Sequence, residues 1–212
     1  MKSTFRMLVI VVLMLGVFGQ YTTASAAEMY NAEMYKWKGP GADAYFSSWD
    51  ESGCVATDVS VFSRDETFQN PPGRPSENSF VYLTIYQYDY CAGLELRFAE
   101  GFAWIAASDL QVAKKLGSAT LSTSLSLYDW TSDTYFDVYV DLTWNATGPA
   151  VKEKSQYRSH APGCKYHSRF QGTYRSAEVY GTVTDGATNY TPWTGWGSIF
   201  DSSGKDMYIG CI

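Results

Sequence analysis

The chain has 212 residues, a formal net charge of −6 and an aromatic content of 17%, with tyrosine as its largest share. An acidic chain without a run of basic residues is a poor candidate for binding nucleic acid or an anionic membrane surface, so we expect no nucleic-acid partner. The length suits one domain with a sizeable core.

The N-terminus has the three parts of a secretory signal peptide. A short basic start precedes an apolar run over residues 8–18, and small residues follow at 24–27. The run is shorter than the roughly 20 apolar residues that span a bilayer, although a single N-terminal membrane anchor is the alternative. We expect residues 1–27 to be removed and residues 28–212 to form one secreted, extracellular domain without a membrane span. The two basic residues of the leader would leave with it, which lowers the net charge from −6 to −8.

Four cysteines lie in the part expected to be exported. An even number in an oxidising compartment predicts two disulfides, for which three pairings exist. We favour Cys54–Cys91 and Cys164–Cys211, because each pair joins cysteines within the same half of the chain.

Apolar and polar residues alternate through most of the domain, which is the pattern of half-buried strands. Only residues 106–116 are compatible with a helix, and a short strand would fit them nearly as well. Polar loops are expected over residues 70–78 and 148–163. About nine or ten short strands joined by turns predict an all-β fold, an antiparallel β-sandwich resembling a jelly roll. The alternating segments cover residues 55–62, 79–93, 94–100, 119–128, 135–144, 177–183 and 207–211.

Residues 121–128 and 135–144 are predicted to form a hairpin. Pairing Tyr128 with Tyr135 gathers aliphatic side chains on one face and Ser, Asp and Tyr on the other. A slip of one residue would mix the two faces, so the aliphatic face is expected to point inward. The predicted buried residues are Leu125, Val138, Val140, Val81 and Leu83, and the predicted accessible ones are Ser124, Asp137 and Asp141.

A row of tyrosines occupies one face of the segment over residues 79–93. We expect this row to face outward, and Tyr86 and Tyr88 of a ligand platform should be substantially exposed, near Tyr139 or Tyr180. Such rings could simply stabilise the sheet through cross-strand pairs. Alternatively, they form a ligand platform, with rings as apolar faces and hydroxyls as hydrogen-bonding groups. The candidate ligand-binding residues are Tyr86, Tyr88, Asp137, Tyr139, Asp141, Trp193 and Trp196.

Two of these candidates, Trp193 and Trp196, lie in a loop rich in Gly, Thr and Pro. The loop could plug one end of the domain with its indole rings. The alternative is that the rings are partly exposed and stack against a ligand.

Motifs for metal or cofactor chemistry are scarce. The sequence has no phosphate-binding loop, dinucleotide fingerprint or EF-hand. It also has no nucleophile elbow beside which one of its two histidines could act as a catalytic base. His160, Cys164 and His167 could hold a metal, but structural zinc normally takes four nitrogen or sulfur ligands. We therefore expect no metal, no cofactor and no catalytic residue.

The function favoured by these patterns is non-catalytic binding or surface association, with carbohydrate as the ligand class. A secreted glycoside hydrolase that uses outward carboxylates is one alternative. Asp137 and Asp141 would then be about 13 Å apart along one strand, beyond the roughly 9.5 Å of inverting enzymes, so another strand would have to supply a partner. A structural component of an extracellular matrix or cell surface is the other alternative.

Overall fold

A computed structural model describes residues 33–71, 73–161 and 164–209. The predicted signal peptide and its cleavage site lie outside these residues and stay predictions. Within them there is no α-helix, only one 3-10 turn among antiparallel strands. The elements are β1 (Glu33–Trp49), β2 (Val55–Gln69), β3 (Ser76–Asp89), β4 (Leu94–Ile105), β5 (Leu110–Val112), η1 (Lys114–Leu116), β6 (Ser118–Asp129), β7 (Thr134–Ala146), β8 (Val151–Ala161), β9 (Cys164–Thr184) and β10 (Gly195–Ile209).

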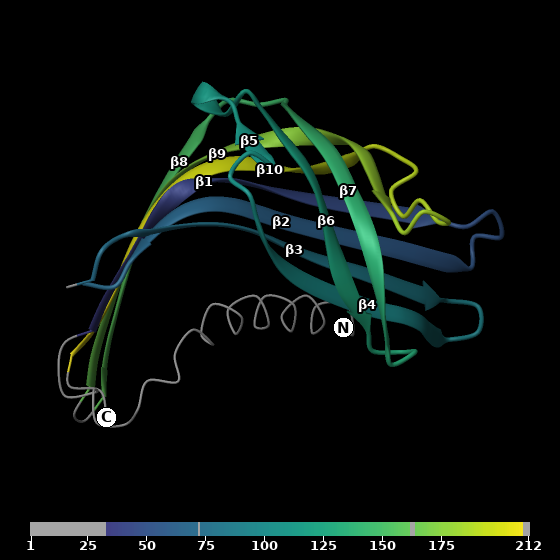
Figure 1. Ribbon diagram of the computed structural model, residues 1–212, viewed down its shortest axis with the longest axis horizontal. Coiled ribbons are helices and arrows are strands. Elements are labelled where there is room, and N and C mark those ends of the chain that lie inside the picture. Colours follow the sequence, from purple (N-terminus) through teal and green to yellow (C-terminus); the bar gives the residue numbers. More distant parts are fainter. Residues whose placement is uncertain (1–32, 72, 162–163, 210–212) are drawn as a thin grey trace.

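All strands belong to one sheet, in the order β10-β1-β2-β3-β4-β6-β7-β9-β8, with β5 paired to β6. Because β10 also pairs with β9, the strands from β9 through β10, β1, β2, β3, β4 and β6 to β7 close into a ring (Figure 1). The predicted antiparallel β class is confirmed. In place of the two packed sheets of a sandwich, one sheet curls so that its own walls face each other.

The core lies inside the ring, on the face that carries the aliphatic side chains. The predicted hairpin pairs as expected, with Tyr128 opposite Tyr135, and the inward and outward faces are confirmed. Trp144 is fully buried and donates its indole N–H to the carbonyl of Asp43 at 2.6 Å. The five residues predicted to be buried are all at most 5% exposed: Leu125, Val138, Val140, Val81 and Leu83.

Two segments differ from their predicted conformations. Residues 106–116 form the three-residue strand β5 and then η1, where Lys115 and Leu116 have positive φ and Leu116 is buried. The expected loop over residues 148–163 contains β8, which pairs along its whole length with β9. Side chains on both faces of β8 are mostly exposed, so this strand lacks the apolar alternation by which strands are found in a sequence.

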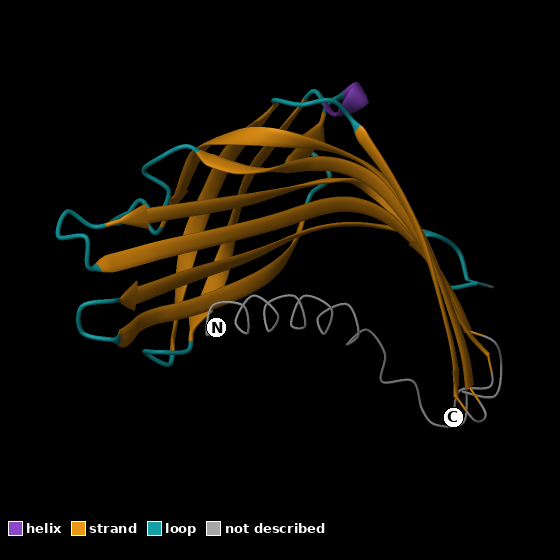
Figure 2. Ribbon diagram, turned by 180° about the vertical axis from the view of Figure 1, so that it is seen from behind, coloured by secondary structure: helices purple, strands orange, loops and turns teal. Residues whose placement is uncertain are grey.

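Several strands run past the ring as a single-layered arm, which bends away at the left of Figure 1 and the right of Figure 2. We define the arm by residues 33–40, 64–69, 151–161, 164–175 and 198–209. On this arm the convex face is the continuation of the outer surface of the ring, and the concave face continues the core side.

Aromatic rings lie flat on the convex face of the arm, over glycines that leave room for them. A Cβ on Gly204 would lie 2.2 Å from the ring of Trp37, and one on Gly41 would lie 2.5 Å from the ring of Phe200. Arg64 stacks on Trp37, with its guanidinium carbon 4.2 Å from the ring centroid, and is only 5% exposed. The arm therefore has a small aromatic packing layer of its own on the outside.

Candidate functional site

Four hairpin loops gather at one end of the ring, at the right and lower right in Figure 1. They are the β1–β2, β3–β4, β6–β7 and β9–β10 connections, which antiparallel pairing brings to the same end. Beside these loops stand six aromatic side chains that are each 54% to 74% exposed. We call them the aromatic rim: Trp49, Tyr90, Trp130, Tyr135, Trp193 and Trp196.

The predicted tyrosine row leads into this rim. Tyr86 and Tyr88 are half-buried and stacked at 6.3 Å, and Tyr88 meets Tyr90 edge-on at 4.8 Å. Trp49 packs on Tyr90 at 5.1 Å. Tyr86 also contacts Phe98 of the neighbouring strand β4. It does not meet Tyr139, because β4 and β6 lie between β3 and β7, the strand that holds Tyr139. The row faces outward as expected, but Tyr86 and Tyr88 are half-buried where a ligand platform predicted substantial exposure, and their neighbours differ from the predicted ones.

A carboxylate ties the β6–β7 part of the rim to β3. The indole N–H of Trp130 donates to Glu100 at 3.1 Å, and the hydroxyl of Tyr82 donates to the same carboxylate at 2.5 Å. Burial and this acid raise the pKa of Tyr82. Tyr128 contacts Trp130 at 4.7 Å and Tyr135 at 5.0 Å, so these rings form one cluster.

Trp193 of the β9–β10 loop and Trp196 at the start of β10 point outward and are 70% and 64% exposed. The interpretation that they plug the end of the domain is therefore wrong. The loop's buried ring is Tyr190, whose hydroxyl donates to Asp185 at 2.6 Å and accepts from Arg97 at 2.5 Å. Burial and Asp185 raise the pKa of Tyr190 to about 12.

The ring of Trp196 lies 5.1 Å from the ring of Tyr45. The Tyr45 hydroxyl in turn donates to Asp58 at 2.7 Å, and burial together with this acid raises the pKa of Tyr45 to about 12. Aromatic rings and hydrogen-bonding carboxylates thus alternate along the outer surface next to the rim.

The three candidates on β7 lie in and beside a shallow hollow between β6, β7 and the loop after β9. Ser126 donates to Asp137, and the hydroxyls of Ser122 and Tyr139 are 2.9 Å apart. Asp137 and Asp141 lie on the same face of β7, four residues and about 13 Å apart along the strand. This pair by itself does not have the spacing of glycosidase carboxylates.

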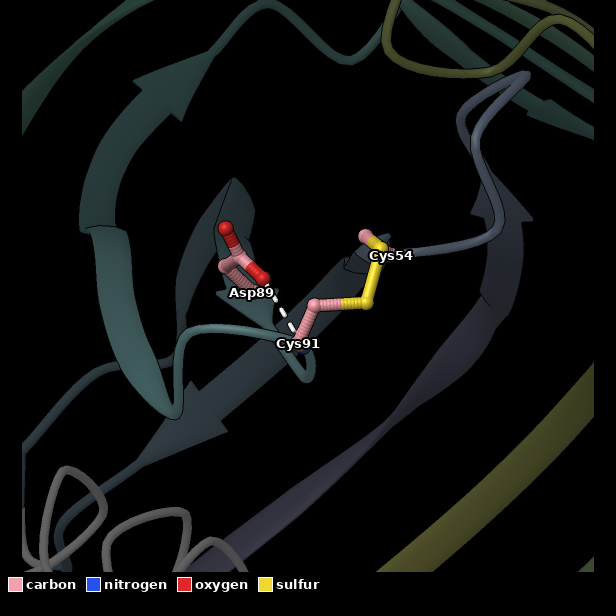
Figure 3. Close-up of side chains that lie close together, drawn as sticks. All are labelled: Cys54, Asp89 and Cys91. Carbon is pink, nitrogen blue, oxygen red and sulfur yellow. Dashed lines mark hydrogen bonds between the residues drawn. A yellow bond between two sulfur atoms is a disulfide. The ribbon is translucent and has the colours of Figure 1, made fainter.

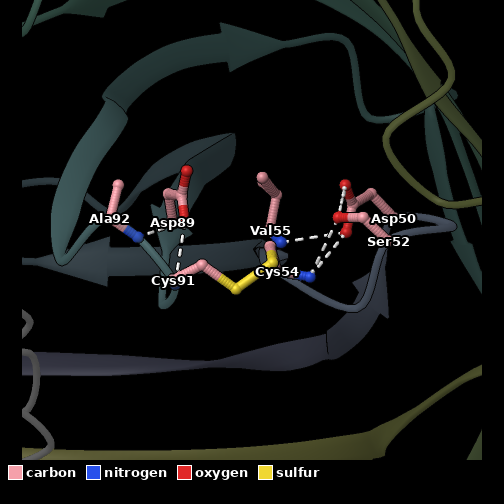
Figure 4. The surroundings of a disulfide bond; sticks show 7 residues. All are labelled: Asp50, Ser52, Cys54, Val55, Asp89, Cys91 and Ala92. Carbon is pink, nitrogen blue, oxygen red and sulfur yellow. Dashed lines mark hydrogen bonds between the residues drawn. A yellow bond between two sulfur atoms is a disulfide. The ribbon is translucent and has the colours of Figure 1, made fainter.

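The predicted disulfide Cys54–Cys91 is present, and it joins the β1–β2 loop to the β3–β4 loop (Figure 4). The carboxylate of Asp50 accepts hydrogen bonds from the amides of Cys54 and Val55, both at 2.9 Å. A hydrogen bond from the Ser52 hydroxyl, together with these two amide bonds, lowers the pKa of Asp50. Two of the four rim loops are therefore covalently linked and internally hydrogen-bonded.

Cys54, Asp89 and Cys91 are near enough to one another to suggest a metal site (Figure 3). Their sulfurs are bonded to each other, however, and a disulfide offers no thiolate for a metal. Asp89 accepts from the amides of Cys91 and Ala92 at 2.9 and 2.8 Å, which is an ordinary turn arrangement. None of the described cysteines is a free thiol. Cys211 lies outside the described residues, so its pairing with Cys164 stays a prediction.

Four members of the rim were not among the candidate ligand-binding residues: Trp49, Tyr90, Trp130 and Tyr135. Each stands at the end of a strand beside a turn, where alternation no longer reports a face. The signal that could have identified these rim residues is an aromatic residue beside the turn residues of several hairpins. His160, inside the expected loop over residues 148–163, lies on β8, and His167 lies on β9; both are in the arm.

A scan of known protein families finds no match for this sequence, and neither does a search of curated proteins. Among solved structures, a Nitrosomonas europaea protein that carries the name AttH aligns with 86% of this chain at 9% identity and a TM-score of 0.27. The chain spans about half of that protein, 52% of its length. So weak a similarity carries no argument about function. Among the described residues, no helix combines the length and apolarity needed to cross a bilayer.

Proposed function

We propose that the protein is an exported, non-catalytic binding protein and that its aromatic rim binds carbohydrate. One observation carries the proposal: six largely exposed aromatic rings stand on or beside four neighbouring loops at one end of the ring. Exposed aromatic surface of this extent is unfavourable in water and marks an interaction site. Aromatic faces suit the apolar faces of sugar rings, while the indole and phenol edges bond sugar hydroxyls.

The charges around the rim favour a neutral sugar. Carboxylates occur on every side of it, among them Asp50, Asp58 and Glu100. The nearby cation Arg97 is engaged by Asp129 at 3.1 Å. Carboxylates accept hydrogen bonds from hydroxyl groups and repel an anionic ligand, so the rim selects against acidic sugars.

The rim is also held in place before any ligand arrives. The disulfide links two loops, and the hydrogen bonds of Asp50 and Asp89 fix their turns. A preformed surface avoids part of the ordering cost of binding, which supports a binding role for these loops.

A structural role through strand-to-strand assembly receives less support. Of the described strands only β9 pairs with β8, so the other edge of β8 is open. That strand carries Lys152, Lys154 and Arg158, and charged side chains on an edge oppose pairing with another sheet.

The exported protein can be tested on a glycan array beside a hydrolysis screen. Trp193→Ala/Trp196→Ala should weaken glycan binding by about tenfold or more, as truncation of central aromatic contacts does in other interfaces. Tyr157→Ala is the matched control, because Tyr157 is 60% exposed but lies on the arm. Equal losses in the two variants, or release of sugar products, would contradict the proposal.

A further inference from the structure

Basic side chains line the concave face of the arm. Within the ring this face carries Ala42 and Ala44 of β1, but further out on the same strand and the same face it carries Lys36 and Lys38. β9 changes in the same way, because its inward positions pass from aliphatic residues in the ring to residues such as Arg169 in the arm. The strand alternation is unbroken while the chemistry of its inner positions switches from apolar to cationic.

The strand register aligns these cations in rows across the sheet. Lys36 is paired with Lys205 of β10, and Lys205 is paired with Arg169 of β9. Next to this row, His167 of β9 is paired with Arg158 of β8. Neighbouring strands are about 4.8 Å apart, and like charges directly opposite each other destabilise a sheet. Folding therefore gains nothing from the row of Lys36, Lys205 and Arg169, whereas Arg158 donates a hydrogen bond to Nε2 of His167 at 3.4 Å.

The cations of the central row have no compensating acid at ion-pair distance. Among the described residues, the salt bridges are Arg64–Glu66 and Arg97–Asp129, and neither involves the concave face. Of the acids on that face, Asp65 and Asp201 share one row nearer the ring, and Glu77 of β3 lies opposite Thr67. The positive charge of the row is therefore left for a ligand to neutralise.

We propose that the concave face of the arm binds a linear anionic polysaccharide, one that carries carboxylate or sulfate groups. The charge is spread over β1, β10, β9 and β8, so it suits a chain of charges better than a single bound ion. Neutral donors lie beside it, because Thr67, Gln69 and Ser203 line a hollow together with the lysines of β1 and β10. Hydroxyl and amide groups of this kind recognise sugar hydroxyls between the charges.

The shape and the faces of the arm argue against other polyanions. Trp37 and Phe170 are on the convex face, so the basic face has no rings from the arm's aromatic layer on which nucleic-acid bases could stack. The face is concave (Figures 1 and 2), whereas a bilayer surface would require a flat or convex one. A flexible polysaccharide can follow the concave surface.

The experiment titrates the exported protein at low salt with polygalacturonate and with dextran sulfate. Neutral dextran, single-stranded DNA and phosphatidylglycerol vesicles form the comparison arms. We expect binding to at least one acidic polysaccharide, weakened steeply by salt. Lys36→Gln/Lys205→Gln should reduce this affinity about tenfold. Lys114→Gln/Lys115→Gln, which removes the same charge from η1 outside the arm, should change it less than twofold.

Equal losses in both double variants, or stronger binding to DNA or vesicles than to either acidic polysaccharide, would overturn the inference. So would retention of full affinity by Lys36→Gln/Lys205→Gln while its thermal transition is unchanged. The result is independent of the rim, because Trp193→Ala/Trp196→Ala should leave acidic polysaccharide binding intact. Failure of one site therefore does not imply failure of the other.

Discussion

The rim and the arm are two ends of the same long strands, yet they expose opposite chemistry. At the rim, aromatic rings and carboxylates face outward over a core enclosed by the ring. In the arm, the aromatic layer stays on the outside, and the inner face is lined by Lys, Arg and His. A net charge of −6 averages these two regions and conceals the basic one.

The physical reason for the difference is whether a second wall stands opposite. Inside the ring, Val140 and Leu142 of β7 are fully buried, because the sheet closes around them. The arm is a single layer, so aliphatic residues at the same positions would be left in water. The inner face of the arm therefore needs polar residues, but it does not need rows of cations. This excess of positive charge is the observation that points to a ligand.

The largest expected effect concerns the link between the rim loops. Replacing both cysteines in Cys54→Ser/Cys91→Ser should lower the free energy of unfolding by about 2–5 kcal/mol, because the disulfide restricts the unfolded chain. Denaturant unfolding of the exported protein measures this. Reducing agent should destabilise the wild type more than this variant, which keeps only the disulfide of Cys164. Stability equal to the wild type would show that the rim does not depend on its disulfide.

A smaller effect on the free energy of unfolding should distinguish substitutions on the inner face of the ring from substitutions on the inner face of the arm. Val140→Ala should cost about 1–3 kcal/mol, from lost burial and the cavity left behind. Gln171→Ala, at an exposed inner position of the arm, should cost less than about 0.5 kcal/mol. Thermal or denaturant unfolding of both variants checks the contrast. Similar costs at the two positions would mean that the arm's inner face is packed.

The hairpin of β6 and β7 illustrates what the sequence predicts well. Its strict alternation specified the face of every residue but not the exact register, and the pairing of Tyr128 with Tyr135 that we assumed is the one observed. β8 was missed because exposure on both faces removes that alternation. The single closed sheet was also missed, since closure depends on β9 pairing with both β7 and β10.

The two candidate surfaces were only partly accessible to sequence reasoning. Trp193 and Trp196 were found because they are close together in a segment rich in Gly, Thr and Pro. The basic rows were not, because Lys36, Arg169 and Lys205 are far apart in the chain and meet only through strand register. Charge patterns read along a sequence do not report charges that neighbouring strands bring together.

The tyrosine row tests whether the rim extends along β3. Tyr86→Ala/Tyr88→Ala should weaken glycan binding by about tenfold if these rings continue the platform. Because both rings are half-buried, the variant should also lose roughly 1–2 kcal/mol of stability. Binding and unfolding are measured on the same preparation, with Tyr157→Ala as the control. A loss of several kcal/mol with binding unchanged would assign the row to packing alone.

The smallest expected effect is a shift in the pKa of His167 in the arm. Partial burial and the nearby Arg158, Arg169 and Lys205 lower this pKa from its ordinary value of 6.5. The folded state therefore disfavours the charged imidazole, and its stability should fall slightly as the pH drops through the pKa of the unfolded chain, near 6.5. NMR titration of the imidazole protons gives the folded value directly.

A bound polyanion should reverse the sign of that shift. Negative charge placed beside Lys205 and Arg169 compensates the cations, so acidic polysaccharide should raise the pKa of His167. Neutral dextran should leave it unchanged. Arg169→Gln should raise the pKa even without ligand, because it removes one of the charges that lower it. If polygalacturonate and dextran sulfate bind but leave the His167 resonances and pKa where they were, the ligand lies elsewhere, and the basic rows of the arm are not its site.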